Sequence, residues 1–581
     1  MPKRLSAAAA VMLLGSCGPS GPPQRMVDLV KEFVYTSLSF SPIQATNAGY
    51  HVHNGTVLDE VLDNYDETEM RRQREYYKDF RKRLERHKPE QLNPEDRADF
   101  DILGNQIQLV LTELDTIQNY KHNPTLYVEL VGQALFTPFV LEYAPIEERY
   151  RHITLRLKRI PALLGAARQN LVDAPEIWTQ VAVRENDGNH DLIVNTLTQN
   201  CPQSNKSEFD RAAREALRAI DDFTNWLTND LSQRKSDWRL GTQKYEAKFG
   251  PALALGVTPQ QVLADAEAEL ARTRQQMLEI ARPLHAKMFP SARASDLNSI
   301  VRDTLSKIAE RHSTKETYFK DAERDLQESR EFVRTKGLMK LPARDNLKVI
   351  ETPVFMRGIY AVGGFNPAPA LQPQLGAFYW LTPFTGSMDS ARVQSKLREY
   401  NYYGLKILTI HEAIPGHYLQ FEYGNSVEPR ERRVLRTVFG NNPYIEGWAV
   451  YATDLLAEHN YLEGDPLFQL TWLKQYLRAV ANTILDIRLH TMGMTDEQAM
   501  DLMMNHTFQE KEEATAKLQR AKLSSTQLPT YFTGFRAWKG LREKVQKHRG
   551  NGFQLAAFHE EALRTGAVPM AALERILMSA K

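Results

Sequence analysis

The chain has 581 residues, with 73 Lys and Arg against 72 Asp and Glu, 42% hydrophobic residues and two cysteines. These proportions are typical of a soluble globular protein of two or more units, and they exclude a disordered, collagen-like or disulfide-scaffolded chain. Because the charges balance, the surface has no overall attraction for a polyanion, so we expect no nucleic-acid partner.

The N-terminus predicts a lipoprotein signal peptide over residues 1–16. A basic start is followed by a short apolar run at residues 5–14, and no later run is long enough to predict a transmembrane helix. Residues 14–17, Leu-Gly-Ser-Cys, resemble a bacterial lipobox, in which Cys17 carries the lipid anchor; Gly18 after it favours an outer membrane. We therefore expect an exported, membrane-anchored lipoprotein facing the periplasm, with a flexible linker at residues 17–25. The alternative is plain secretion with an incidental cysteine.

The rest of the chain predicts a mainly α fold. Apolar residues recur every three or four positions at residues 26–38, 76–84 and 100–114, which indicates amphipathic helices. Thr258, Pro259 and Gln261 form a helix start before a long helical pattern at residues 262–288.

Strand signals are few. Residues 348–356 and 376–381 are β-branched or aromatic and lie between Pro and Gly clusters, so they predict a small β-sheet. We expect this sheet near the active-site cleft. Residues 376–381 are either a core strand or an edge strand that pairs with an extended peptide. The best boundary divides a helical N-terminal region, residues 26–250, from a second helical region, residues 251–581, which holds the motifs below.

Two histidines and a glutamate interrupt an apolar helical segment at His411, Glu412 and His417. In the HExxH arrangement of zinc hydrolases, two histidines four residues apart share a helix face, and the glutamate handles the proton of the metal-bound water. Here the second histidine comes six residues after the first, which is about 240° around an undistorted helix. Pro415 and Gly416 can interrupt that helix. A shared metal therefore predicts a bulge or break at residues 414–416.

A third ligand would leave the fourth corner of a tetrahedron for water, and Glu446 is the candidate. It is the polar residue that opens an otherwise apolar helical segment. Taken singly, Glu446 can also be an acid that favours a helix N-terminus, and His417 a hydrogen-bonded core histidine. Together with His411 and Glu412, these residues favour a metal site.

The segments HEAIPGHYLQ, residues 411–420, and EGWAVY, residues 446–451, resemble the bacterial family called domain of unknown function 885. Its members resemble the zinc peptidases of the thermolysin superfamily, especially its large helical peptidases, and the resemblance covers nearly the whole mature chain. It implies one Zn²⁺ per chain, bound by His411, His417 and Glu446, with Glu412 as general base. It also implies that His490, Arg520 and Tyr531 belong to the active site.

These further residues have alternative roles. Tyr531 or His490 can stabilise the oxyanion of a peptide-bond hydrolysis, and Arg520 can bind a substrate carboxylate. Alternatively, His490 lines a helix interface and Arg520 is a surface cation. The chain departs from the family at Thr453, where a second acid that orients a metal-bound histidine is usual; here Asp454 follows it.

Three hypotheses of function remain at the level of the sequence. The first is a membrane-anchored zinc metallopeptidase that hydrolyses peptides through a metal-activated water. The second is a metal-dependent hydrolase of another amide or ester. The third is a non-catalytic lipoprotein that binds a ligand in a helical cleft.

Overall fold

The computed structural model describes residues 23–291, 296–357, 362–384, 386 and 388–579. The predicted signal peptide and the lipid-bearing Cys17 lie outside the described residues.

The N-terminal part is a succession of helices joined by short loops. Its α-helices are α1 (Met26–Phe40), α2 (Pro42–Asn47), α3 (Glu67–Leu84), α4 (Pro94–Thr112), α5 (Asn119–His122), α6 (Pro124–Val140), α7 (Ile146–Leu157), α8 (Ile160–Asn170), α9 (Glu176–Asp191), α10 (Lys206–Asn229) and α11 (Gly241–Leu253). A two-stranded hairpin of β1 (Val52–His53) and β2 (Thr56–Val57) lies between α2 and α3.

The C-terminal part begins with a long helix and holds the larger sheet. Its α-helices are α12 (Pro259–Met288), α13 (Leu297–Ile308), α14 (Tyr318–Lys336), α15 (Ser390–Glu399), α16 (Tyr402–Glu412), α17 (His417–Gly424), α18 (Arg430–Val438), α19 (Asn442–Glu458), α20 (Pro466–Thr491), α21 (Asp496–Asp501), α22 (Lys511–Leu523), α23 (Pro529–Arg549), α24 (Leu555–Arg564) and α25 (Met570–Ser579). Its strands are β3 (Leu347–Glu351), β4 (Gly363–Asn366) and β5 (Ala377–Leu381).

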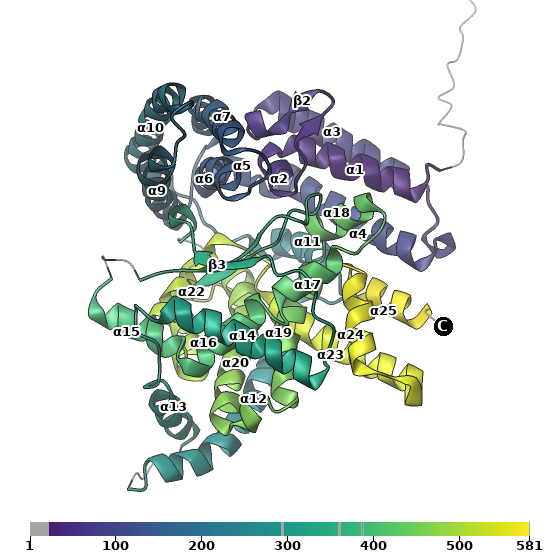
Figure 1. The fold of residues 1–581 in the computed structure, drawn as a ribbon, viewed down its shortest axis with the longest axis vertical. Coiled ribbons are helices and arrows are strands. Elements are labelled where there is room, and N and C mark those ends of the chain that lie inside the picture. Colours follow the sequence, from purple (N-terminus) through teal and green to yellow (C-terminus); the bar gives the residue numbers. More distant parts are fainter. Residues whose placement is uncertain (1–22, 292–295, 358–361, 385, 387, 580–581) are drawn as a thin grey trace, which may run out of the picture.

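In Figure 1 the purple and blue helices of the N-terminal part lie mainly above the larger sheet, and most of the teal, green and yellow helices of the C-terminal part lie below it. Helix α18 is an exception, because it packs against α1 and α4. One apolar core joins helices α1, α3 and α4 to the C-terminal helices, and a second core fills the space among α6 to α10. Residues 250 and 251, the predicted boundary, lie inside α11. The division into two regions stays a prediction.

The larger sheet has the order β3-β5-β4, with β5 parallel to β3 and antiparallel to β4. All five residues of β5 are buried. The prediction that residues 376–381 are a strand is confirmed, but the edge-strand alternative is wrong, because strands occupy both sides of β5. Strand β4 is at the end of this strand order, and Gly363 and the preceding Val362 line the cavity described below.

The predicted helices are present. Residues 26–38 lie in α1, residues 76–84 in α3, and Thr258 caps α12 through a reciprocal pair of hydrogen bonds with Gln261. Residues 348–356 divide into β3 and a short 3₁₀ turn at Val354–Met356. The mainly α fold with a small sheet is therefore confirmed.

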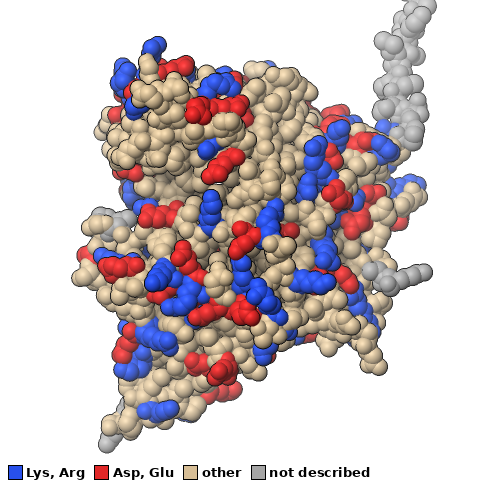
Figure 2. Space-filling model, in the orientation of Figure 1, with Lys and Arg blue, Asp and Glu red and all other residues tan. Residues whose placement is uncertain are grey.

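Acidic and basic side chains are interspersed over the face shown in Figure 2, as expected from the balanced composition. In the part of the chain that the structure describes, no helix combines the length and the apolar character needed to cross a membrane.

Candidate metal centre

The helix that carries the histidine motif breaks where the sequence predicts. Helix α16 ends at Glu412, α17 begins at His417, and the Gly416 amide donates a hydrogen bond to the Ile410 carbonyl at 2.9 Å. A Cβ atom on Gly416 would lie 1.9 Å from the His411 carbonyl oxygen, so this close turn requires glycine. The break is confirmed, and it brings the His411 and His417 rings to a centroid distance of 4.8 Å.

Helix α19 brings Glu446 to the two imidazoles. The Trp448 indole donates to the Pro415 carbonyl at 2.8 Å and so fastens α19 to the turn between α16 and α17. Glu446 Oε2 lies 3.6 Å from His411 Nε2 and 3.4 Å from His417 Nε2. Ligand atoms at the corners of a tetrahedral zinc site are separated by about 3.4 Å, given bonds of about 2.0–2.1 Å. The separations of Glu446 Oε2 from the two imidazoles are therefore close to those between ligand atoms that share one zinc ion.

The polar atoms of this cluster also fit a cation. Glu446 Oε2 is buried and accepts no regular hydrogen bond from the described residues. Burial alone would raise the pKa of Glu446, but His411 and His417 outweigh it and hold the pKa well below its ordinary value. Burial likewise opposes protonation of His417, whereas Glu446 raises its pKa overall. Two imidazoles and an ionised carboxylate form a donor set that zinc prefers.

A close helix contact completes the surroundings of Glu446. Helices α19 and α23 touch backbone to backbone, because a Cβ atom on Gly447 would lie 2.3 Å from the Gly534 carbonyl carbon. This contact brings the start of α23 to the candidate metal cluster, the group of His411, His417 and Glu446. Gln527 Nε2 donates to Glu446 Oε1 at 3.2 Å, which leaves Oε2 to face the histidines. Gln527 thus positions the carboxylate, a role that sequence reasoning did not assign.

The cluster opens onto a cavity of ≈ 140 Å³. His411, Glu412, Arg520 and Tyr531 all line it. The Glu412 side chain makes no hydrogen bond or ion pair with any described residue, so its carboxylate has both oxygens available to a molecule in the cavity. The residue is only 9% exposed.

Tyr531 lies against His411, with ring centroids 6.2 Å apart. Its hydroxyl accepts hydrogen bonds from Gln527 Nε2 at 3.3 Å and from Arg520 at 3.4 Å. Because both of these contacts use the oxygen as acceptor, the hydroxyl proton remains for a group in the cavity. Burial raises the pKa of Tyr531 to about 12, which keeps that proton on the hydroxyl at neutral pH.

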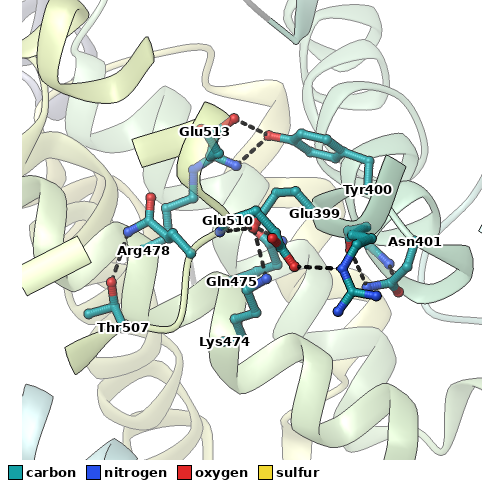
Figure 3. Close-up of polar contacts among 12 residues, drawn as sticks. Glu399, Tyr400, Asn401, Lys474, Gln475, Arg478, Thr507, Glu510 and Glu513 are labelled. Atoms are coloured by element: carbon teal, nitrogen blue, oxygen red, sulfur yellow. Dashed lines mark hydrogen bonds and ion pairs between the residues drawn. The ribbon is translucent and has the colours of Figure 1, made fainter. Parts of the chain in front are cut away.

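Away from the metal cluster, the cavity wall is a network of buried charges (Figure 3). Arg478 forms an ion pair with Glu513 and donates to the Tyr400 hydroxyl at 2.5 Å, and that hydroxyl donates to Glu513 at 3.2 Å. Behind it, Glu399 accepts from Lys474 at 2.8 Å. This network could not be predicted from the sequence, because charged residues spaced along helices are typical of solvent-exposed helix faces.

His490 lies outside the cavity lining. Its Nε2 contacts the Ser524 carbonyl at 2.9 Å, its Nδ1 accepts from the Leu240 amide at 3.4 Å, and its ring stacks on Tyr245. In this arrangement both nitrogens of His490 contact backbone groups, which favours its alternative role at a helix interface. A catalytic role for His490 stays a prediction.

Thr453 lines the cavity, but its hydroxyl contacts the carbonyl of Ala449 in its own helix at 3.5 Å. The adjacent Asp454 binds Lys539 at 2.6 Å and Trp472 at 3.2 Å. Within the described residues, neither makes a hydrogen bond or ion pair with a histidine of the cluster, so neither takes the histidine-orienting role that the resemblance implies for an acid at this place.

The chain matches the family model for a bacterial protein of unknown function, DUF885, over residues 42–577, and it belongs to that family. It is similar to the solved structure of a proposed lipoprotein of unknown function from Shewanella oneidensis, with 29% identity, a TM-score of 0.78, and coverage of 96% of this chain and 100% of that one.

A proposed lipoprotein from Colwellia psychrerythraea has a similar fold, with 19% identity, a TM-score of 0.76, and coverage of 96% and 98%. No curated protein matches the chain.

Proposed function

We propose that the chain is a membrane-anchored zinc metallopeptidase that hydrolyses peptides. The observation that carries this proposal is the convergence of His411, His417 and Glu446, whose ligand atoms all lie within 4.8 Å of one another beside a cavity. When bound there, Zn²⁺ supplies a Lewis acid that polarises a carbonyl oxygen and acidifies a water molecule.

The side chains around the cavity have the properties that hydrolysis requires. Glu412, which has no partner among the described residues, takes a proton from the attacking water and delivers it to the departing amine. The Tyr531 hydroxyl donates to the oxyanion that develops on the attacked carbonyl. Arg520, which also lines the cavity, holds the substrate in place.

A peptide is the substrate class that the surrounding backbone favours. Strand β4 pairs with β5 along one of its edges and is the last strand in the order of the sheet. Gly363 of this strand and the neighbouring Val362 line the cavity. An extended peptide can add main-chain hydrogen bonds to such a boundary strand. An ester or an isolated amide offers no comparable series of backbone groups.

The location at a membrane rests on two separate observations. The similar structure from Shewanella oneidensis is of a proposed lipoprotein, and this chain carries a lipobox-like segment ending at Cys17. Acylation of Cys17 would attach the mature chain to the membrane, on the periplasmic side of an outer membrane, as Gly18 favours.

Glu412→Gln is the sharpest test of the function. The variant should keep one zinc per chain, because Glu412 is not among the ligands, while the turnover of a peptide library falls by about 10²- to 10⁴-fold. Zinc is measured by plasma mass spectrometry of the untagged protein, and cleavage by mass spectrometry of the digest. Glu428→Gln, at an exposed carboxylate outside the cavity, is the matched control.

The other hypotheses predict different results. Zinc-dependent turnover of esters or amides without peptide cleavage would favour the broader hydrolase. A zinc-free protein whose behaviour does not change in His411→Ala would favour the non-catalytic lipoprotein.

A further inference from the structure

Lys517, in α22, has surroundings that are unusual for a lysine. It lines the cavity, is only 5% exposed, and makes no hydrogen bond or ion pair with any described residue. Taking an ammonium group out of water is costly unless an anion or a hydrogen-bond acceptor replaces the water. A buried lysine that faces a cavity without a counter-ion therefore indicates a ligand that brings the negative charge.

The neighbouring acids are already engaged. Glu513 lies one helical turn before Lys517, but it forms an ion pair with Arg478 and accepts from the Tyr400 hydroxyl. Glu446 faces the two histidines.

The neighbouring cations make the position of Lys517 less favourable still. Burial lowers the pKa of Lys517 well below its ordinary value, and the charges of Arg478 and Arg520 lower it further; the charges of Glu513 and Glu446 raise it without offsetting these effects. A negative group that enters the cavity would relieve the repulsion between the cations. Glu412 is the remaining acid among the described lining residues, and it serves as the general base in the proposed reaction.

The cavity also limits the size of what it accepts. Its ≈ 140 Å³ is well below the roughly 300–1,000 Å³ of sites for drug-sized ligands. Its lining combines charged side chains with apolar ones, which are Ile407, Leu408, Val450, Trp472 and Ala479. Such a lining suits the end of a peptide that carries both apolar atoms and one charged group.

We propose that Lys517 binds a substrate carboxylate, so that the enzyme cleaves a peptide bond next to a residue that carries a negative charge. This inference rests on the proposed peptidase function. The carboxylate comes either from the C-terminus of the peptide or from an Asp or Glu side chain beside the scissile bond.

Binding of small probes tests Lys517 without any turnover. In zinc-loaded Glu412→Gln protein, calorimetry measures the affinities for N-acetylglycine and N-acetylglycinamide. The first carries a carboxylate where the second carries a neutral amide. We expect the carboxylate to bind about 10-fold or more tightly than the amide, as charge-assisted hydrogen bonds imply. Lys517→Met in the same background should reduce that preference to about 2-fold, and Lys517→Arg should retain most of it.

The control is Lys522→Met, on the same helix, whose ammonium pairs with Asp496 at 2.7 Å and does not line the cavity. If zinc alone held the carboxylate, the Lys517→Met protein would still prefer N-acetylglycine to N-acetylglycinamide. An unchanged preference in that variant would therefore overturn the proposal.

Peptide substrates then identify the source of the carboxylate. Amidation of the C-terminus should lower kcat/KM by about 10-fold or more if the terminal carboxylate binds Lys517, and replacement of Glu by Gln should do so if the side chain binds. Whichever of the two modifications lowers kcat/KM in the wild type should no longer lower it in Lys517→Met. If neither modification matters to the wild type, the inference fails although peptide cleavage persists. If no peptide is cleaved at all, the proposed function fails. The binding of N-acetylglycine and N-acetylglycinamide then still tests whether Lys517 binds a carboxylate.

Discussion

The cluster around Glu446 and the pair of His490 with Asp486 both bring histidine and carboxylate together in the described C-terminal residues, and they differ in what their polar atoms face. In the cluster of His411, His417 and Glu446, one carboxylate oxygen accepts no regular hydrogen bond and faces two imidazoles beside a cavity. In the other cluster, His490 uses both ring nitrogens on backbone groups; Asp486 Oδ2 accepts from Tyr245 at 2.6 Å and from the Thr526 amide at 2.8 Å, and its Oδ1 accepts no hydrogen bond from the described residues.

The comparison shows that residue type does not separate a site from a structural contact. Both clusters combine imidazole with a buried carboxylate, which is the combination that sequence reasoning seeks. Both clusters also contain one carboxylate oxygen without a hydrogen bond from the described residues. What differs is the imidazoles: His490 uses both nitrogens on backbone groups, whereas His411 and His417 direct Nε2 toward Glu446 Oε2. Nitrogen atoms that converge on an oxygen in this way can share a metal ion.

The largest expected effect is a loss of zinc affinity that occurs in the Glu446 cluster and not in the His490 cluster. Glu446→Gln removes a charged ligand, so zinc affinity should fall by more than the roughly 10- to 100-fold that loss of a residue behind a ligand causes, and peptide cleavage should fall to background. His490→Ala should leave zinc content at one per chain, because both His490 nitrogens bind backbone groups. Zinc titration against a chelator of known affinity measures both variants. Loss of zinc from His490→Ala with retention in Glu446→Gln would reverse the assignment of the clusters.

Tyr531→Phe tests the cavity side of the metal cluster. Removing a single oxyanion donor costs about 3 kcal/mol in the transition state, so kcat should fall by about 10²- to 10³-fold while zinc content stays unchanged. Tyr245→Phe, which removes the hydroxyl that contacts Asp486, is the matched control in the other cluster and should leave kcat within about 2-fold of the wild type. Equal losses of kcat in the two variants would exclude a specific role for Tyr531.

Gln527→Leu tests the residue behind Glu446. The amide holds Oε1 at 3.2 Å, and without it the carboxylate is free to rotate away from the histidines. We expect zinc affinity to fall by about 10- to 100-fold, with the fold intact by circular dichroism. A variant that binds zinc as tightly as the wild type would show that Glu446 does not need this contact.

The smallest effect concerns the metal-free protein. The pKa of Glu446 in the folded chain lies below its ordinary 4.5. The ionised carboxylate therefore stabilises the folded state fully above pH 4.5, and this stabilisation is lost as the pH falls through the lowered pKa. The pKa of His417 is raised above its ordinary 6.5, so its stabilisation is complete below pH 6.5 and is lost as the pH rises through the raised value. The difference in unfolding free energy between the wild type and Glu446→Gln should therefore be largest between pH 4.5 and 6.5. Urea titrations after chelation measure it, and a difference that keeps growing above this window would contradict the pairing.

Much of the metal cluster was predictable because its signals are local. Pro415 and Gly416 between two histidines predict a broken helix, and the structure explains why, since a side chain at Gly416 would collide with the His411 carbonyl. Helix α12 was predictable from its capping residues for the same reason.

What could not be predicted depends on contacts between distant segments. Strand β4 contains Gly363 and Gly364, which are weak strand formers, and it exists because β5 pairs with it. Lys517 looks like a surface residue of an amphipathic helix until α20 and α22 pack side by side. The position of His490 depends on Ser524 and Leu240, residues 34 and 250 positions away.

The most direct test of the central claim is X-ray absorption at the zinc edge on the purified, zinc-equilibrated chain. We expect one zinc per chain, with two imidazole nitrogens and a carboxylate oxygen at about 2.0–2.2 Å. This signal should be lost in His417→Ala. A chain that takes up no zinc, or that keeps an unchanged zinc spectrum in His417→Ala, would contradict the account.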